Sequence, residues 1–594
     1  MKLPSLQYVT ERSLQTFRRF PAALLCSFIA GAIAIFLVGL HGEGPEWKHL
    51  IMAFSLGVPA YFSLELFLER SRWEGNSRVR VYSSALLFFI LVFYWWFLNE
   101  SSGEWRILQY TQLWVILCCF VSFAPFTGPD EVNGYWQYNR HLVSRGILTS
   151  VYVFVLFGGL SLALLASEKL FGLHINHEYY ERLWLFAAYG FWPWHFFGGL
   201  PSSLGRLEQE KTYPKALRIF SQYMLLPLFA LYLLILYAYM GKIIVEQKWP
   251  VGWVGWLVSY ASAFGLLMLL LLYPEKERKE TRWIRYVERG FYFAVLPLLV
   301  LLFIAAYKRI AIYDLTEMRY YLVALGLWFF CLSLYMAVTL SRNIKLIPIS
   351  LMVVSALTSF GPWGAYSLSR HRQTQRLEHL LLEHHLLKDG KAVPSDSPVP
   401  FETVKDISGN AEYLYDHFDS GALQTWSREK LSSASDEVNY CARQTTLDRF
   451  LDEMGLQYIH KWAKENQVRY ANFSSDLDAI PCDGYRLMIP VSKDHDVATG
   501  AHRKTQSEVR LNASAKSFDV FLQGHKVGGF SYDVMLRRLA AMKAHDGKID
   551  GKLMTLDGFS SRPEARLYLM NVDLTLKADG SYDIRDFGGY LLLK

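Results

Sequence analysis

Long apolar stretches recur along the first 366 residues of the chain and then stop. Each approaches the roughly 20 residues that cross a bilayer as a helix, and a short polar segment separates each stretch from the next. The pattern predicts a polytopic α-helical membrane bundle of about 11 spans, because nearly uncharged runs of that length are typical of membrane-spanning helices. The predicted spans cover residues 20–40, 49–68, 81–98, 107–127, 146–167, 183–200, 217–241, 251–273, 290–307, 320–341 and 346–366.

The polarity of the chain changes after Tyr366, where the predicted transmembrane domain (residues 1–366) ends. Residues 367–400 should form a juxtamembrane helix and a linker, with Gly390 as the C-cap of the helix. Residues 401–594 should form a soluble α+β domain, because helical patterns give way there to a two-residue alternation that predicts an antiparallel sheet. The predicted helices cover about 402–418, 444–465 and 532–545, and the predicted strands lie near 485–491, 507–513, 517–522, 527–531, 566–577 and 581–594.

The composition of the chain also indicates two environments. Hydrophobic residues make up 52% of the chain and charged residues only 19%, against roughly 25% charged in soluble proteins, which excludes an ordinary soluble enzyme. The net charge of +7 divides at Tyr366 into +9 before it and −2 after it. Because the basic excess lies in short loops and forms no continuous cationic face, nucleic-acid binding is excluded.

Lysine and arginine are distributed unevenly between alternate loops. If the N-terminus is cytoplasmic, 22 of these residues lie inside and 9 outside, as the positive-inside rule predicts. An odd number of crossings then places the C-terminal domain outside the cytoplasm, and the first apolar run acts as an uncleaved start-transfer helix. In that oxidising compartment Cys441 and Cys482 could form a disulfide, and two buried free thiols are the alternative of equal weight.

Few ionisable residues lie inside predicted spans, and they include Glu65 in the second and His195 in the sixth. Placing an ionisable side chain within a membrane costs free energy, so such a residue indicates a structural or functional role. Their similar depth near the cytoplasmic ends would let the pair bind a cation or relay protons. The sequence favours a structural alternative, because neither lies near mid-bilayer: Glu65 reaches the interface and His195 is a hydrogen-bonded packing residue.

The segment between the ninth and tenth spans gathers polar side chains that form a candidate site at the outer face. Its arginines could hold the phosphate or carboxylate of a ligand, because a guanidinium grips either group with two hydrogen bonds. The structural alternative is that Asp314, three residues before Glu317, caps the start of the tenth span. The candidate site residues are Arg309, Tyr313, Arg319 and Tyr320.

The sequence contains no familiar catalytic motif. It lacks the nucleophile elbow, the phosphate-binding loop, the dinucleotide-binding glycines, the zinc-protease helix and the kinase motifs. His379 and Glu383 have the i, i+4 spacing of metal ligands, but without a metal-binding motif around them they are better explained as a solvated helix face. We therefore expect no metal site and no cofactor, and a non-enzymatic function is favoured over an enzymatic one.

Several segments together resemble a known family. They are the opening "MKLPSLQYVTERSLQTFRRFP", "KIIVEQKWPVGWVGWLV", "RIAIYDLTEMRYYLVAL", "SFGPWGAYSLSRHRQTQRLEHLL" and the ending "GGYLLLK". In this order they resemble the bacterial inner-membrane family known as domain of unknown function 4153. The resemblance implies a polytopic protein of the bacterial cytoplasmic membrane and supplies no activity. One departure is Asp314, where the family pattern usually has glycine, and the matching positions are Pro250, Gly252, Arg309, Tyr313, Thr316, Arg319, Tyr320, Gly361, Pro362 and Ser369.

Three classes of function stay open at this point. The leading one is a multi-pass membrane protein that transports or binds a small or lipidic molecule, or anchors an envelope-facing domain. The second is a membrane transferase acting on lipid-linked substrates at the outer face, for which Glu43 and Glu46 in the first outer loop are the candidate acids. The third is a structural component of an envelope complex. The expected partners are the lipid bilayer and other envelope proteins, and the sequence does not identify a ligand.

Overall fold

The computed structural model describes residues 6–39, 45–100, 105–128, 130–173, 175–210, 212–247, 253–278, 281–339, 343–395, 397–418, 420–431, 440–460, 469–475, 480–482, 484–492, 507–512, 517–522, 525–540, 546–558, 565–576 and 582–593. The chain divides into two compact units, Met1–Tyr458 and Ile459–Lys594. The domain boundaries expected after residues 366 and 400 stay predictions.

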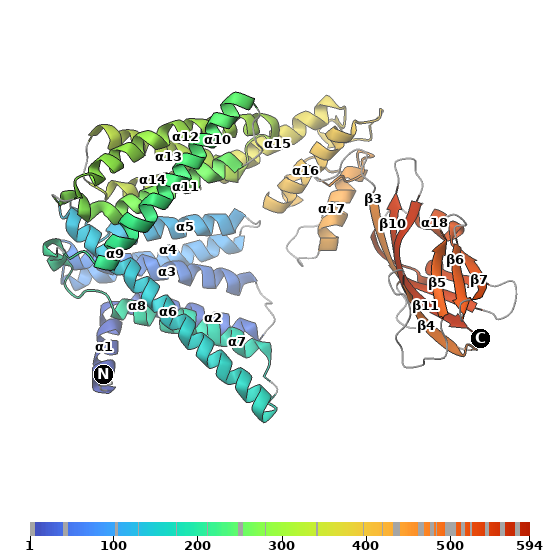
Figure 1. Cartoon of the computed structure of the whole chain (residues 1–594), viewed down its shortest axis with the longest axis horizontal. Coiled ribbons are helices and arrows are strands. Elements are labelled where there is room, and N and C mark those ends of the chain that lie inside the picture. The colour runs from blue at the N-terminus through green and yellow to red at the C-terminus, as the bar shows by residue number, and fades with distance from the viewer. Residues whose placement is uncertain are drawn as a thin grey trace. The chain divides into compact units, whose positions relative to one another are not determined.

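Apolar helices dominate the first unit, as expected for a membrane bundle (Figure 1). Within the ranges given above, nine helices are long and apolar enough to cross a membrane. They are carried by α2 (Pro21–Val38), α3 (Pro45–Arg70), α4 (Ser77–Glu100), α5 (Trp105–Phe123), α6 (Val132–Phe171), α9 (Lys215–Ile219) with η3 (Phe220–Leu225) and α10 (Leu226–Glu246), α11 (Trp253–Leu272) with η4 (Tyr273–Glu277), α12 (Ile284–Tyr313) and α13 (Glu317–Thr339).

The predicted count of about 11 spans is not confirmed, because two of the expected spans are not among these nine helices. The expected span 183–200 is a helix of three segments, α7 (His177–Leu185), η1 (Phe186–Phe191) and α8 (Trp192–Gly198), whose first turns are charged. The expected span 346–366 is α14 (Leu346–Ser359), which has 14 residues. At about 1.5 Å per residue α14 is about 21 Å long, less than the roughly 30 Å of a bilayer core.

Two π-helical segments each precede a proline. Phe186–Phe191 lies before Pro193, and Phe220–Leu225 lies before Pro227. Proline has no N–H, so the carbonyl four residues earlier loses its helical partner and the ladder rearranges. The structure satisfies one of these carbonyls from outside the helix, because Ser27 Oγ donates to Tyr189 O at 2.6 Å.

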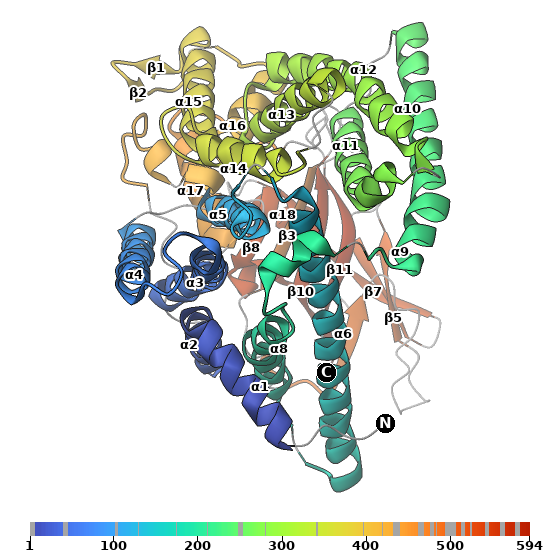
Figure 2. The same ribbon diagram turned by 90° about the vertical axis from the view of Figure 1, so that its left-hand side faces the viewer.

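The helices of the first unit pack in one continuous series. α2, α3, α5 and α14 contact in that order, and α14 then contacts α13, which continues through α12 and α11 to α10. In Figure 2, which looks along most of these helices, α2 to α5 form one group and α10 to α13 another, with α14 between them. A single apolar core connects the two groups, with Phe62, Phe126, Phe291 and Trp328 among its buried residues.

After α14 the chain leaves the bundle and forms α15 (Ala365–Glu383), a short hairpin of β1 (Leu387–Lys388) and β2 (Lys391–Ala392), α16 (Phe401–Phe418) and α17 (Tyr440–Asp452). The expectation that Gly390 caps the juxtamembrane helix is wrong. Asp389 and Gly390 both have positive φ, 54° and 74°, which is the geometry of a two-residue hairpin turn and explains the Asp-Gly pair.

The second unit is built on two sheets. The larger has strand order β4-β11-β10-β3-β8 with β9 also paired to β10, and the smaller has order β5-β6-β7. All pairs are antiparallel except β3 with β8. The strands are β3 (Arg469–Ser475), β4 (Leu487–Ser492), β5 (Ser507–Asn512), β6 (Ser517–Leu522), β7 (His525–Ser531), β8 (Asp546–Ile549), β9 (Thr555–Gly558), β10 (Ala565–Leu576) and β11 (Tyr582–Leu593), and the helix between β7 and β8 is α18 (Asp533–Ala540).

The alternation in β10 explains the core of this unit. Leu567 and Leu569 are buried, the register shifts before Asn571, and the burial then resumes at Val572 and Leu574. The expected strands near 485–531 and the closing hairpin are confirmed, whereas β3, β8 and β9 were not predicted. The turn expected at 578–580 lies outside the described residues.

Candidate functional site

The turn between α12 and α13 is the centre of the candidate site predicted between the ninth and tenth spans. Its backbone carbonyls are exposed by the break between the two helices, and three side chains converge on Tyr313 O. Arg319 donates to it at 3.1 Å, Gln373 at 3.2 Å and Arg376 at 3.0 Å. Two of these donors come from α15, so the helix after the last apolar segment is hydrogen-bonded to this turn.

Further bonds fix the same turn to α15 and α16. Gln373, which is buried, also donates to Leu315 O at 2.9 Å. Arg372 contacts the Asp314 carboxylate at 3.1 Å, and the Tyr413 hydroxyl of α16 donates to Glu317 Oε2. Burial, followed by the Glu317 carboxylate, raises the pKa of Tyr413 above its ordinary value of 10.0. The phenol therefore keeps its proton and remains a donor.

The predicted arginine pair occupies this site with different roles. Arg319 faces the backbone, because it also donates to Asp314 O at 2.5 Å. Arg309 is exposed and makes no ion pair with any described residue. The charges of Arg309 and Arg376 both act on Arg319, so three guanidinium groups lie close together at this end of the bundle.

The other expected members of the site are also placed. The Tyr313 side chain is half-exposed and the Arg319 guanidinium lies 5.5 Å from its ring centre. Tyr320 donates from its hydroxyl to Trp363 O at 2.9 Å. Asp314 does not cap α13 as expected, because its Oδ1 accepts from the next backbone N–H, that of Leu315, at 2.6 Å.

The sequence did not indicate Gln373, Arg376 or Tyr413 as partners of this turn. They lie 58 to 96 residues downstream of the groups they bind, so no local spacing in the sequence indicates them. The repeated Gln and Arg residues in "RHRQTQR" were the available signal. A polar helix directly after an apolar one needs a polar surface to pack on.

Glu65 and His195 each have partners of their own. The Glu65 carboxylate is buried and lies 3.3 Å from the Arg80 guanidinium. His195 Nδ1 bonds to Thr149 Oγ1 at 2.9 Å, and its backbone carbonyl accepts from Arg145 at 2.6 Å. Glu65 is thus buried against Arg80 and does not extend to solvent, whereas His195 is hydrogen-bonded. A direct function for the Glu65–His195 pair stays a prediction.

A second polar network lies at the opposite end of the bundle, around Lys345. The buried Lys345 ammonium donates to Gly128 O at 2.6 Å and to Asp130 O, and burial lowers its pKa. Other bonds at this end join Arg70 to Glu131 at 2.7 Å, and Asn133 to Glu208 O at 2.8 Å. We call this end of the bundle the Lys345 end. The opposite end, where the turn of Tyr313–Glu317 lies, is called the Asp314 end.

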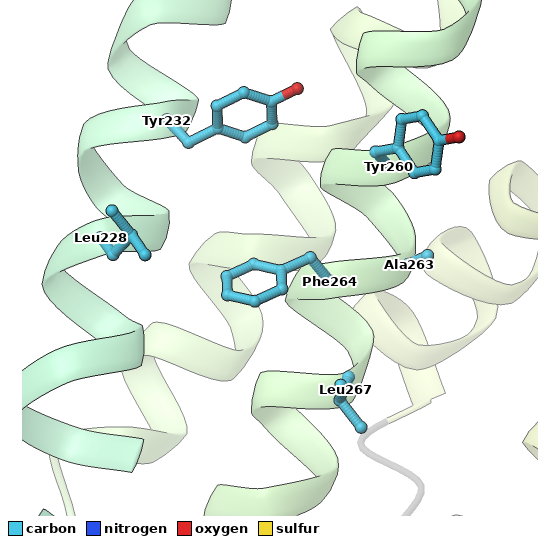
Figure 3. A pocket seen from close by; sticks show the side chains of 6 residues that line it. All are labelled: Leu228, Tyr232, Tyr260, Ala263, Phe264 and Leu267. Carbon is cyan, nitrogen blue, oxygen red and sulfur yellow. The ribbon is translucent and has the colours of Figure 1, made fainter. Parts of the chain in front are cut away.

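An apolar pocket lies between α10 and α11. It has a volume of about 560 Å³. Figure 3 shows Leu228 and Tyr232 on one wall and Tyr260 and Phe264 on the other. The Tyr232 hydroxyl is bonded to Leu257 O at 3.2 Å, so the walls offer mainly apolar contacts. Such a lining suits the hydrocarbon part of a lipidic molecule.

Three further expectations concern residues outside these sites. Cys482 is exposed, and the side chain of Cys441 lies outside the described part of the chain, so their disulfide stays a prediction. Glu43 also lies outside it, whereas Glu46 is in the first turn of α3 and its backbone carbonyl accepts from Trp95. His379 contacts Glu383 at 3.6 Å on an exposed face of α15.

Comparisons with known proteins match the chain to an uncharacterised family. Residues 22–395 match the family described as "Domain of unknown function (DUF4153)". An uncharacterized protein of Pasteurella multocida (strain Pm70) is 26% identical over 401 residues, which are 65% of this chain and 63% of that protein. The match thus spans less than two thirds of the relative's length. No solved structure matches the chain.

Proposed function

Since the chain belongs to the family Domain of unknown function (DUF4153), we propose that it is a multi-pass protein of the bacterial cytoplasmic membrane that anchors a C-terminal domain at the outer surface. The observation that carries this proposal is the docking of α15 and α16 on the turn between α12 and α13. Gln373 binds the carbonyls of Tyr313 and Leu315, and Tyr413 binds the buried carboxylate of Glu317. The chain that follows therefore starts from a fixed point at the end of the bundle.

The proposed topology has eleven crossings and a cytoplasmic N-terminus. α7, η1 and α8 have 9, 6 and 7 residues, so together they reach about 33 Å, enough to cross. α7 contacts α2, while α8 contacts α1, which precedes α2 in the chain. This pairing supports a helix that runs antiparallel to α2 along its length. The excess of Lys and Arg on the loops of the Lys345 end supports a cytoplasmic location for that end.

The anchoring role is tested by releasing α15. In the double variant Gln373→Ala, Arg376→Ala, Tyr313 O keeps only the Arg319 donor and Leu315 O loses the Gln373 donor. An acceptor that is left unpaired out of water costs about 1–3 kcal/mol. We expect α15 and α16 to become sensitive to limited proteolysis in membranes, while the apolar helices stay protected. His379→Ala is the matched control on an exposed face of the same helix. Unchanged protection in the double variant would contradict the anchoring role.

A second proposed function is binding of the anionic group of a small or lipidic molecule at the Asp314 end. The supporting observation is the cluster of Arg309, Arg319 and Arg376, in which Arg309 is exposed and has no ion pair within the described ranges. A phosphate or carboxylate would relieve the mutual repulsion of these groups. Transport of such a molecule, transfer of a lipid-linked group at Glu43 or Glu46, and a purely structural role in an envelope complex are the alternatives.

The anion site is tested with dioctanoyl phosphatidic acid as the probe and dioctanoylglycerol as its uncharged counterpart. We expect the first to raise the unfolding temperature of the purified chain and the second to leave it unchanged. Arg309→Ala should weaken binding at least about ten-fold, because a hydrogen bond to a charged group contributes about 1.5–3 kcal/mol. Arg289→Ala, at an exposed arginine of α12, should bind as the wild type does. Equal binding by both arginine variants would exclude the site.

A further inference from the structure

Glu317 is a buried carboxylate without a matching positive charge. Its side chain is 2% exposed. Tyr413 donates to Oε2, whereas Oε1 has no hydrogen-bond partner, and the carboxylate makes no ion pair with any residue that the structure describes. Burying a carboxylate in this way is costly unless a cation or several donors compensate it. The negative charge of Glu317 therefore requires a compensating cation or further hydrogen-bond donors.

Hydroxyl groups from several helices gather around this carboxylate. The charge of Glu317 acts on the phenols of Tyr321, Tyr366 and Tyr413, and Ser369 lies within hydrogen-bonding reach of the Tyr413 hydroxyl. The hydroxyls of Tyr321 and Tyr366 lie within hydrogen-bonding reach of each other. These two hydroxyls and that of Ser369 are buried and have no well-aligned partner among the described residues. Polar atoms left in this state in a folded interior indicate bound water or a bound ion. Here they come from α13 and α15 and lie near one acid.

The donor set defines the class of ligand. Carboxylate and hydroxyl oxygens are hard donors that suit alkali and alkaline-earth cations and not soft metals. Calcium sites use several carboxylates and carbonyls, and magnesium keeps much of its water, whereas this cluster has one carboxylate. The guanidinium of Arg319, two residues along the chain, is occupied by two backbone carbonyls of the turn. A single positive charge would balance the single acid.

We propose that Glu317, Tyr321, Tyr366, Ser369 and Tyr413 bind a monovalent cation such as Na⁺. The ion joins α13 to α15 and α16, because its ligands come from all three helices. It therefore stabilises the packing of these helices. The site does not depend on the anion site or on the orientation of the chain in the membrane.

The test compares the unfolding temperature of the full-length chain in detergent in sodium chloride and in choline chloride at equal ionic strength. We expect sodium to raise it by a few degrees with a saturable dose dependence, since a ligand that binds only the folded state stabilises it. Glu317→Gln should abolish the difference between the two salts. Glu378→Gln, which changes an exposed acid on α15, should retain it.

Two further variants keep the test decisive if Glu317→Gln fails to fold. Ser369→Ala and Tyr366→Phe each remove one oxygen and leave the carboxylate, and we expect each to raise the sodium concentration at half-effect several-fold. Identical unfolding of the wild type in both salts would overturn the proposal and would indicate that bound water occupies the cluster. A sodium effect that survives in Glu317→Gln would overturn it as well.

Discussion

Asp314 holds a backbone conformation that suits glycine. Its φ of 56° and ψ of −173° lie in a region that residues with a side chain rarely enter, at a cost of about 1–3 kcal/mol. Glycine has no Cβ and would adopt this geometry without that cost. The carboxylate compensates for the strain in this chain, because it accepts from Leu315 N at 2.6 Å and contacts Arg372 at 3.1 Å.

This compensation predicts opposite outcomes for two substitutions. Asp314→Gly removes the strain together with the bonds, so we expect the free energy of unfolding to stay within about 1 kcal/mol of the wild type. Asp314→Ala keeps the strain and loses the bonds, and should destabilise by about 1–3 kcal/mol. Thermal unfolding of the two purified variants checks this. An alanine variant more stable than the glycine variant would refute the strain argument.

At the scale of elements, the sequence predicts the helices that long apolar stretches form and the strands that show a two-residue alternation. The spans at 20–40, 49–68 and 320–341 correspond to α2, α3 and α13, and the closing hairpin corresponds to β10 and β11. Contacts between distant segments leave no such signal. Arg319 was expected to face a ligand, yet it binds carbonyls of its own turn, because the helix break leaves them unpaired.

A single sequence also does not show which glycines are required for two helices to approach closely. A Cβ placed on Gly31 of α2 would lie 2.6 Å from Tyr189 Cβ of η1, whereas a Cβ on Gly159 of α6 would meet nothing within 4 Å. Both glycines lie within apolar helices, and only the packing distinguishes them. Gly31 is thus required where α2 crosses the π-helical segment.

We expect Gly31→Ala to destabilise the bundle by about 1–3 kcal/mol, because Tyr189 Cβ is fixed to its backbone and cannot move aside. The same change at Gly159 should be neutral or stabilising by up to about 1 kcal/mol, since alanine favours helix more than glycine does. Thermal unfolding of both variants in one detergent makes the comparison. Equal effects at the two positions would show that the crossing of α2 and η1 tolerates a methyl group.

At the scale of the whole membrane unit, contacts divide the loops into two sets. Bonds at the Lys345 end join loops that follow alternate predicted spans: Arg70 with Glu131, Lys345 with Gly128, and Arg218 with Glu275 at 3.1 Å. At the Asp314 end, Arg106 contacts His49 at 2.9 Å and Tyr320 contacts Trp363. This division matches the alternation proposed from eleven crossings, including the two short or interrupted helices.

Reporter fusions test both the orientation and the crossing by α7, η1 and α8. A reporter active only outside the cytoplasm should give signal after Leu173 and after Lys594, and none after Arg80 or Ser203, because the loop basic residues hold Arg80 and Ser203 inside. Leu173 and Ser203 flank the interrupted helix, so equal signals there would show that it does not cross. The reverse pattern at all four positions would invert the protein in the membrane. Inversion would also place Cys441 and Cys482 in the reducing cytoplasm, where a disulfide between them would not persist.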